Sequence, residues 1–346
     1  MLALRKVAPR PGVAIENVDA PEMPSRGEVL VQVAAVGICG TDLHIDDWAD
    51  GFHAMASALP VTLGHEFCGR VHAVGEGVTA FKAGDRVVVQ PAIGCGKCAP
   101  CQAGARHDCL NRSAIGMHRA GGFAKYVSAP ADYCIAMPPG MSDLHGALVE
   151  PLTTGAQAVK IGEVKEGDRV TVFGPGPIGQ GAAAMARLAG AAEVHVVGYR
   201  DGPRFATLRK MGFDSFTDLA DDDGEATLRK VARGGFDVAI DASGAPSVIN
   251  TGLSVLKPYG VFVIASMPDH EAPLDVMLLV RGRTQLRGCS RAPDWAWADA
   301  IEALSKNPAL FAPMVTHELA LEEGLEGFRL MRSREASKVI LRPNAS

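Results

Sequence analysis

The chain has 346 residues and a mass of 36.2 kDa, which is enough for about two domains of ordinary size. Its net charge of −5 and pI near 6.1 argue against a nucleic acid or an anionic membrane as partner. The sequence contains neither a signal peptide nor an apolar run of about 18 residues, so we expect a cytoplasmic protein without a membrane span.

The first part of the chain, to about residue 155, is predicted to be rich in short β-strands. Valine-rich runs over residues 29–36, 69–74 and 86–89 are separated by glycines and prolines that are typical of turns. The stretch 91–122 that follows is rich in Gly, Cys and polar residues and has few apolar side chains. A loop of this length inside a compact domain indicates a functional segment or one held by a metal.

The remainder of the chain alternates between strand and helix patterns. The expected strands are 169–173, 194–198, 236–240 and 260–266, the expected helices are 178–189 and 204–211, and a last strand is expected at 338–342. Strands that alternate with helices predict parallel βαβ units. The fold class is therefore α/β, in which a β-rich domain is joined to a doubly wound parallel sheet.

Four of the eight cysteines crowd into one short stretch, as Cys95, Cys98, Cys101 and Cys109. In a reducing compartment, clustered cysteines indicate a metal site rather than disulfides. Four thiolates bind zinc tetrahedrally in a closed structural site, and the metal would replace the missing apolar core of the loop. An iron–sulfur cluster also uses four cysteines, and the spacing alone leaves that alternative open.

A second set of candidate metal ligands is dispersed along the chain. It comprises Cys39, His65, Glu66 and Glu150. A cysteine, a histidine and a carboxylate that leave one position open are typical of a catalytic zinc site. Each residue alone could be a buried thiol, a core histidine or an ordinary charge. It is their joint occurrence with the cysteine tetrad and a dinucleotide motif that favours a catalytic site, and either glutamate could complete it.

A glycine-rich turn joins the strand that ends at residue 173 to the helix that follows it. The turn has the G-x-G-x-x-G pattern, and its residues are Gly174, Gly176, Pro177, Ile178 and Gly179. The glycines allow a tight turn, a close approach to a pyrophosphate and close packing of helix on strand. The helix N-terminus adds free N–H groups and a partial positive charge. This pattern predicts a nicotinamide dinucleotide site.

The end of the next strand predicts which dinucleotide is bound. NAD sites place an acid there for the ribose hydroxyls, but this strand ends in Gly198, with Arg200 two residues later and Arg204 in the next helix. Arginine pairs with the 2′-phosphate of NADP, so NADP is favoured over NAD. Two alternatives stay open. Asp201 could reach the ribose, and both arginines could simply be solvated surface residues.

Taken together, these motifs make the chain similar to the zinc-containing medium-chain dehydrogenases, the superfamily of alcohol, sorbitol and threonine dehydrogenases. The resemblance covers nearly the whole chain. It rests on Gly64-His65-Glu66-x-x-Gly69-x5-Gly75, on the cysteine tetrad and on the glycine turn. The run Cys39-Gly-Thr41-Asp-Leu-His44 and the pair Glu150-Pro151 look most like the threonine and polyol branch.

The resemblance implies a domain plan and further site residues. A GroES-like catalytic domain would comprise residues 1–155 and 290–346 with two zinc ions, and a Rossmann domain would comprise 156–289. Thr154 would lie against the nicotinamide, Thr41 would accept the hydrogen bond of the alcohol, and His44 would relay the proton outward. A homotetramer is implied, with a dimer as the alternative.

The predicted function is therefore hydride transfer between a secondary alcohol of a polyol or sugar and NAD(P), with L-threonine as the alternative substrate. Three other classes of protein agree less well with the sequence. A reductase of this fold without zinc disagrees with the candidate ligands. A binding protein for NADP with only the structural zinc would lack the catalytic metal. A nucleic-acid module built on the tetrad disagrees with the acidic pI and the scarcity of basic residues near it.

Overall fold

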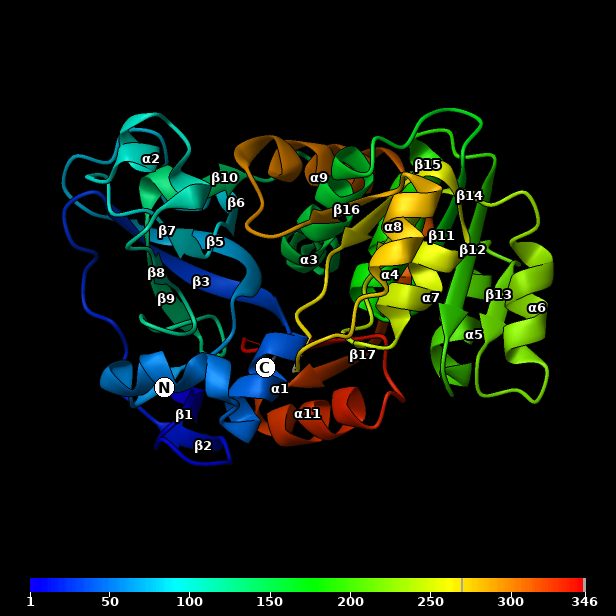
Figure 1. Ribbon diagram of the computed structural model, residues 1–346. Coiled ribbons are helices and arrows are strands. Elements are labelled where there is room, and N and C mark those ends of the chain that lie inside the picture. Colours follow the sequence, from blue (N-terminus) through cyan, green and yellow to red (C-terminus); the bar gives the residue numbers. More distant parts are fainter. Residues whose placement is uncertain (269, 345–346) are drawn as a thin grey trace. The chain divides into compact units, whose positions relative to one another are not determined.

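A computed structural model describes residues 1–268 and 270–344 (Figure 1). The chain divides into two compact units. The first unit combines residues 1–150 with 315–346, and the second comprises residues 151–314. Among the described residues, no helix is long and apolar enough to cross a membrane.

These boundaries differ at two places from the predicted domains, 1–155 with 290–346 and 156–289. Residues 151–155 and 290–314 fall in the second unit. Local contacts explain why the second segment stays there. The side-chain amide of Gln157 donates to the Ser290 carbonyl at 3.1 Å, which holds the segment to the helix that precedes the parallel sheet. Sequence periodicity carries no signal for such a contact.

The first unit is built on β-structure that is antiparallel except for the parallel pair of β17 and β18. Its main sheet has the order β10-β6-β5-β3-β18-β17, with β9 also paired to β3, and a smaller sheet has the order β2-β1-β4. The strands are β1 (Leu2–Lys6), β2 (Ala14–Asn17), β3 (Glu28–Gly37), β4 (Val61–Thr62), β5 (Glu66–Val74), β6 (Arg86–Val89), β9 (Tyr126–Pro130), β10 (Cys134–Ala136), β17 (Val315–Ala320) and β18 (Lys338–Arg342). The β-rich prediction is confirmed, because β-branched side chains from several strands form one buried core.

Short elements and helices complete the first unit. They are α1 (Gly40–Asp47), η1 (Asp50–Ala58), β7 (Ala92–Ile93), α2 (Ala99–Gln102), η2 (Arg106–Asp108), β8 (Ser113–Ala114), η3 (Ala131–Tyr133), η5 (Leu321–Glu323) and α11 (Gly324–Arg332). The expected loop at 91–122 thus contains only one two-stranded ribbon and short helical turns. Helix α3 (Asp143–Ile161) continues from the first unit into the second.

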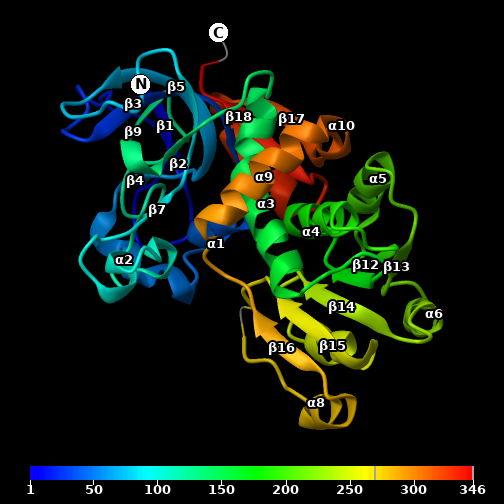
Figure 2. The same cartoon turned by 90° about the horizontal axis from the view of Figure 1, so that it is seen from above.

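The second unit is a doubly wound sheet of six parallel strands, in the order β13-β12-β11-β14-β15-β16. The strands are β11 (Arg169–Phe173), β12 (Glu193–Gly198), β13 (Phe216–Asp218), β14 (Phe236–Asp241), β15 (Leu256–Ile264) and β16 (Gln285–Gly288). The connecting helices are α4 (Pro177–Leu188), α5 (Gly202–Lys210), α6 (Gly224–Val231), α7 (Val248–Ser254) and α8 (Val276–Gly282), followed by α9 (Asp294–Lys306), α10 (Pro308–Phe311) and η4 (Ala312–Met314). Helices α4 and α5 lie on one face of the sheet (Figure 2). The α/β prediction is confirmed.

The order of the strands changes direction at β11, because β12 and β13 are added on one side of it and β14, β15 and β16 on the other. In doubly wound sheets of this order, ligands bind at the carboxyl ends of the strands beside the point of reversal. The glycine turn follows β11 directly and so occupies this place.

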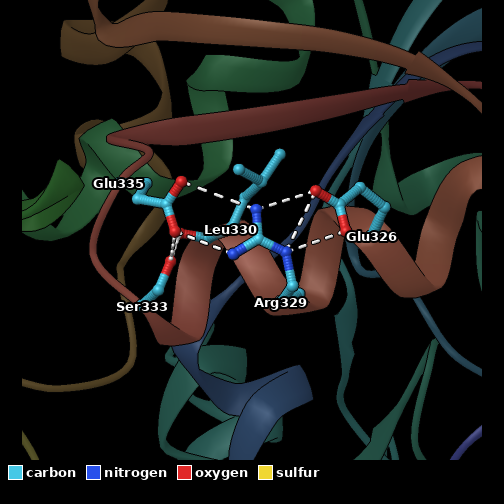
Figure 3. A network of polar contacts seen from close by, with 5 residues as sticks. All are labelled: Glu326, Arg329, Leu330, Ser333 and Glu335. Carbon is cyan, nitrogen blue, oxygen red and sulfur yellow. Dashed lines mark hydrogen bonds and ion pairs between the residues drawn. The ribbon is translucent and has the colours of Figure 1, made fainter.

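A polar network fixes the turn that leads from α11 into β18 (Figure 3). The guanidinium of Arg329 donates to the carboxylates of Glu326, at 2.8 Å, and Glu335, at 2.7 Å. The Ser333 hydroxyl donates to Glu335 at 2.7 Å. These exposed pairs contribute little energy individually, and they tie α11 to the segment that leads into β18, whose first residue is Lys338.

A buried histidine in β12 predicts a pH-dependent stability. His195 is 1% exposed, and its ring nitrogens lie 2.8 Å from the Ser215 hydroxyl and 2.9 Å from the Thr217 hydroxyl. Burial lowers the pKa of His195 from 6.5 to about 4, so the folded ring stays neutral while the unfolded chain takes up a proton. Stability therefore falls as the pH drops from 6.5 towards 4, by up to about 3 kcal/mol.

We expect this loss to be reduced when His195 is replaced by glutamine, which hydrogen-bonds without titrating. The measurement is the difference in melting temperature between about pH 7.5 and about pH 5 for both proteins, followed by circular dichroism. Titration of other groups affects both proteins equally and cancels in the comparison. An identical pH dependence in the two proteins would show that His195 does not contribute.

Candidate functional site

The four clustered cysteines come together in the structure. Cys95 follows β7, Cys98 is the N-cap of α2, Cys101 lies within α2 and Cys109 follows η2. Their four sulfur atoms all lie within 4.8 Å of one another, and none of these cysteines forms a disulfide. The short loop thus gathers the donor set that a closed tetrahedral zinc site requires.

Backbone hydrogen bonds to two of the four sulfur atoms also fit a metal. Backbone hydrogen bonds from Cys101 and Leu110 lower the pKa of Cys98 to about 6. Backbone N–H groups of Cys95 and Asn111 donate to the sulfur of Cys109 at 3.2 and 3.3 Å. Donors of this kind stabilise thiolates, which are the form that binds zinc.

Polar contacts also anchor the loop that carries the four cysteines, called the lobe below. The Gly94 N–H donates to the Tyr133 hydroxyl at 2.7 Å, and the Arg106 guanidinium lies 4.4 Å from the centroid of the Tyr133 ring. Arg106 also donates to the Gln90 side chain at 2.8 Å. These polar and cation–π contacts join the lobe to Gln90, just after β6, and to Tyr133 of η3. A metal bound by the tetrad would add to them.

A second donor cluster forms where β3 and β5 meet. Cys39 is the N-cap of α1 just after β3, and Glu66 begins β5 immediately after His65. The antiparallel register pairs Glu66 with Gly37, so the end of one strand brings its ligands to the start of the other. The sulfur of Cys39, a ring nitrogen of His65 and a carboxylate oxygen of Glu66 lie within 4.8 Å of one another.

The absence of a side chain at Gly37 is necessary for this arrangement. A Cβ atom built at Gly37 would collide with a carboxylate oxygen of Glu66. His65 is 5% exposed and Glu66 is fully buried. The donors thus meet in a site shielded from water, where charges interact strongly.

Two charged residues that the sequence analysis missed surround these donors. The carboxylate of Asp42 accepts a hydrogen bond from the Cys39 N–H at 2.9 Å, and its other oxygen lies 3.7 Å from Nδ1 of His65. The ammonium of Lys338 donates to both Glu66 oxygens, at 2.9 and 2.6 Å, and to the Ile38 carbonyl at 3.0 Å. A carboxylate behind a ligating histidine is the usual arrangement that orients the ring.

These charges control protonation within the cluster. Burial lowers the pKa of His65, but the negative charges of Asp42 and Cys39 outweigh burial and raise it well above 6.5. Burial and the charge of Glu66 raise the pKa of Cys39. A divalent cation would reverse both shifts, because it favours the deprotonated ligands. The donor set and its excess of negative charge therefore fit zinc.

Glu150, on α3, is adjacent to the cluster but is not part of it. Burial, together with the negative charges of Glu66 and Asp42, raises its pKa to about 7 against the opposite effects of His65 and Lys338. Among the described residues, the donors within 4.8 Å of one another are Cys39, His65 and Glu66. The charges of the cluster thus affect Glu150, but its carboxylate is not among the donors that lie within 4.8 Å of one another.

The other two residues predicted for catalysis lie on α1. Thr41 and His44 are three positions apart, which places them on one face of the helix, and both are half-buried. The His44 ring stacks on Phe52 of η1, with the centroids 6.2 Å apart. Both residues share α1 with its N-cap Cys39, and their roles in catalysis stay predictions.

The glycine turn has the shape of a phosphate cradle. Gly174 has a φ of 98°, and a Cβ built there would lie 2.7 Å from the Ala242 carbonyl oxygen, while one at Gly179 would collide with the Gly174 carbonyl. Gly176, the N-cap of α4, is open, and the nearest atoms to its built Cβ belong to Arg204. The two outer glycines close the turn and the middle one leaves room, which fits a dinucleotide pyrophosphate.

Thr154 and the residue after it lie in α3, where that helix meets α4. A Cβ built at Gly155 would lie 2.8 Å from the Ala182 nitrogen, so the two helices approach each other at backbone distance. Thr154 is half-buried at this crossing. Its predicted contact with the nicotinamide stays a prediction.

The missing acid at the end of β12 has a steric reason. A Cβ built at Gly198 would lie 2.7 Å from Phe205 and 3.0 Å from Pro175, so no side chain fits at this position. Arg200 follows with a φ of 54° and an exposed side chain. Gly198 therefore cannot supply the carboxylate that NAD sites place at the end of this strand.

Comparisons with known proteins agree with both halves of this description. The model of the alcohol dehydrogenase GroES-like domain matches residues 25–139, and that of the zinc-binding dehydrogenases matches residues 177–306. L-Threonine 3-dehydrogenase of Bacillus subtilis (strain 168) is 35% identical over 346 residues, covering 99% of both chains.

Two solved structures extend the similarity to the fold. The 2R,3R-butanediol dehydrogenase from Bacillus subtilis shares 29% identity with a TM-score of 0.88. A zinc-binding dehydrogenase from Sinorhizobium meliloti 1021, solved with NADP, shares 29% identity with a TM-score of 0.84. Each comparison covers 99% of both chains. With the two donor clusters and the glycine turn, these matches show that the chain belongs to the zinc-dependent medium-chain dehydrogenases of the alcohol dehydrogenase superfamily and is an NAD(P)-dependent alcohol dehydrogenase.

Proposed function

We propose that this enzyme oxidises a secondary alcohol of a polyol or sugar-like substrate with NADP, and that it carries two zinc ions per chain. The observation that supports the reaction most directly is the buried cluster of Cys39, His65 and Glu66, since this donor set leaves a position open for substrate. The cysteine tetrad would hold the second, structural zinc. A homotetramer, or alternatively a dimer, and a cytoplasmic location stay predictions.

The chain's own residues prepare the chemistry around the cluster. Cys39 and His65 would hold zinc with Glu66 or Glu150, and the carboxylate of Asp42, 3.7 Å from Nδ1, would orient the His65 ring. Zinc supplies a Lewis acid that polarises the substrate oxygen, and the dinucleotide supplies the hydride acceptor. Thr41 would accept the hydrogen bond of the hydroxyl group, and His44 would carry the proton to solvent.

NADP is proposed as the preferred coenzyme on two grounds. Gly198 provides no carboxylate for the ribose and has no room for one, and the exposed Arg200 follows it. The Sinorhizobium meliloti relative was solved with NADP. The alternative to a polyol is L-threonine, which is supported by the activity named for the Bacillus subtilis relative.

The test combines elemental analysis with a substrate panel. We expect two zinc ions per purified chain, and reduction of NADP, faster than of NAD, when polyols, 2,3-butanediol or L-threonine are supplied in turn. Iron in place of zinc would indicate a cluster at the tetrad. One zinc ion and no turnover with any alcohol would contradict the proposal and favour a dinucleotide-binding protein with only a structural metal.

A further inference from the structure

Three charged residues follow β12 within one turn of chain, and they differ sharply in environment. Arg200 is exposed, while Asp201 is only 4% exposed and the Arg204 side chain is 14% exposed. Asp201 is the N-cap of α5, and Arg204 lies in the first turn of that helix. A charged pair is seldom buried without a function, since its desolvation is costly.

The carboxylate of Asp201 is directed at donors of its own chain. One oxygen accepts the Tyr199 N–H at 3.1 Å, and the other lies 3.6 Å from the guanidinium of Arg204. It does not cap α5 through its side chain. An acid that binds ribose hydroxyls must present an oxygen to the ligand, whereas Asp201 is buried, with one oxygen hydrogen-bonded to its own chain and the other within ion-pair distance of Arg204.

The guanidinium of Arg204, in turn, lies against the glycine turn. Nη1 and Cζ of Arg204 lie 3.7 and 4.0 Å from a Cβ built at Gly176, closer than any other described side chain that is not adjacent in the chain. Gly176 caps α4, whose first N–H groups are the expected partners of the pyrophosphate. Arg204 thus adds a positive charge to the part of the site that meets the same chemical group in NAD and NADP.

Arg200 occupies a different position. Its backbone N–H donates to Asp218 at 2.9 Å, and its guanidinium lies 5.5 Å from the centroid of the exposed Tyr199 ring. It therefore lies just past the end of β12, where the 2′-phosphate of NADP distinguishes the two coenzymes. The two arginines are consequently not equivalent in this structure.

We propose that Arg204 binds the pyrophosphate common to NAD and NADP, and that Asp201 is a positioning residue that holds Arg204 there rather than a ligand of the ribose. Discrimination between the coenzymes is then left to Arg200. This inference rests on the proposed function only in that the chain binds one of these dinucleotides at its glycine turn. It does not depend on the alcohol or on which coenzyme is preferred.

The test is direct binding of NADH and of NADPH to the zinc-loaded protein, followed by nicotinamide fluorescence without any alcohol. Arg204→Gln is expected to weaken both by the same factor, about ten- to a hundredfold, because both lose one charge-assisted hydrogen bond. Asp201→Asn keeps an acceptor for the Tyr199 N–H and removes the charge, so it should weaken both by a smaller common factor. Combined with Arg204→Gln, it should add little further loss, since it acts through Arg204.

The matched control is Lys210→Gln, which makes the same charge change at an exposed position in the last turn of the same helix. It should leave both affinities unchanged. Loss of NADPH binding alone in Arg204→Gln would make Arg204 a 2′-phosphate ligand. Loss of NADH binding alone in Asp201→Asn, persisting in the double variant, would make Asp201 a ribose ligand. Either result overturns the inference.

The same experiment separates this inference from the proposed function. Wild-type protein that binds neither dinucleotide would overturn both. Wild-type protein that binds them but turns over no alcohol would contradict only the proposed reaction. Tighter binding of NADH than NADPH would contradict only the coenzyme preference, and the equal loss expected for Arg204→Gln would still be measured.

Discussion

Cys39→Ser is expected to lose one of two zinc ions and to lower kcat/KM for alcohol oxidation by more than about a hundredfold, while the protein stays folded. Loss of a residue that only supports a metal ligand costs about 10–100-fold, and a ligand should cost more. The fold should survive because Cys39 caps α1 and is only half-buried, outside the apolar core. Metal analysis, circular dichroism and steady-state kinetics on the same preparation check all three parts.

Two other cysteines provide matched controls for this substitution. Cys134→Ser changes a buried thiol in β10 that belongs to neither donor cluster, so it should leave the zinc content and activity unchanged. Cys101→Ser should remove the other zinc ion and lower the melting temperature, because its lobe has little core of its own. Full activity with two zinc ions in Cys39→Ser would show that the cluster at β3 and β5 does not bind the catalytic metal.

The parts of the site that the sequence predicts are those in which the donors lie close together along the chain. Cys95 to Cys109 span one loop, so their spacing alone brings the sulfurs within reach of one another. The glycine turn is likewise local, since strand, turn and helix are consecutive. The predicted strands 86–89, 169–173 and 338–342 have the observed bounds for the same reason, because their apolar runs are short and bounded by turn residues.

The residues that sequence reasoning missed act across long separations. Lys338 meets Glu66 over 272 residues, and nothing in the run around Lys338 distinguishes it from a surface lysine of an edge strand. Asp42 lies within the run from Cys39 to His44, but only the fold shows that its carboxylate faces His65. Asp201 gave an ambiguous signal, because its distance along the chain suited a ribose contact and its burial is invisible in the sequence.

Helix α3 and strand β16 were not predicted from the sequence, for a related reason. Helix α3 includes Pro151, which lacks an N–H for the helical hydrogen bond and therefore suggests the end of a helix. Strand β16 has four residues with little β-branched character, and it becomes a strand because it extends the sheet beside β15. In both places, tertiary contacts override the local preference.

Lys338→Met is expected to destabilise the zinc-free protein by about 3–5 kcal/mol, because it leaves the buried carboxylate of Glu66 without its cation. Both side chains are nearly inaccessible, at 2% and 1% exposure, so water cannot replace the lost partner. For a unit of this size we expect the melting temperature to fall by roughly 6–20 °C. The measurement is thermal unfolding after chelation of the metals, compared with wild type treated in the same way.

The double variant Glu66→Gln/Lys338→Met should be more stable than Lys338→Met alone, because it removes the unpaired charge, and Lys338→Arg should lie close to wild type. Equal stability of the single and double variants would show that the charge of Glu66 is not the cause.

Zinc makes the same variant informative about the catalytic site. If Glu66 is the third protein ligand, the metal's charge replaces that of Lys338, and adding zinc should restore most of the stability lost in Lys338→Met relative to wild type. If Glu150 is the ligand instead, Glu66 keeps an unpaired charge and the difference between variant and wild type should persist with zinc bound. The distances favour the first result, since Glu66 shares the 4.8 Å cluster with Cys39 and His65 and Glu150 does not. The stability difference with and without zinc thus decides which carboxylate faces the metal, even before a substrate is known.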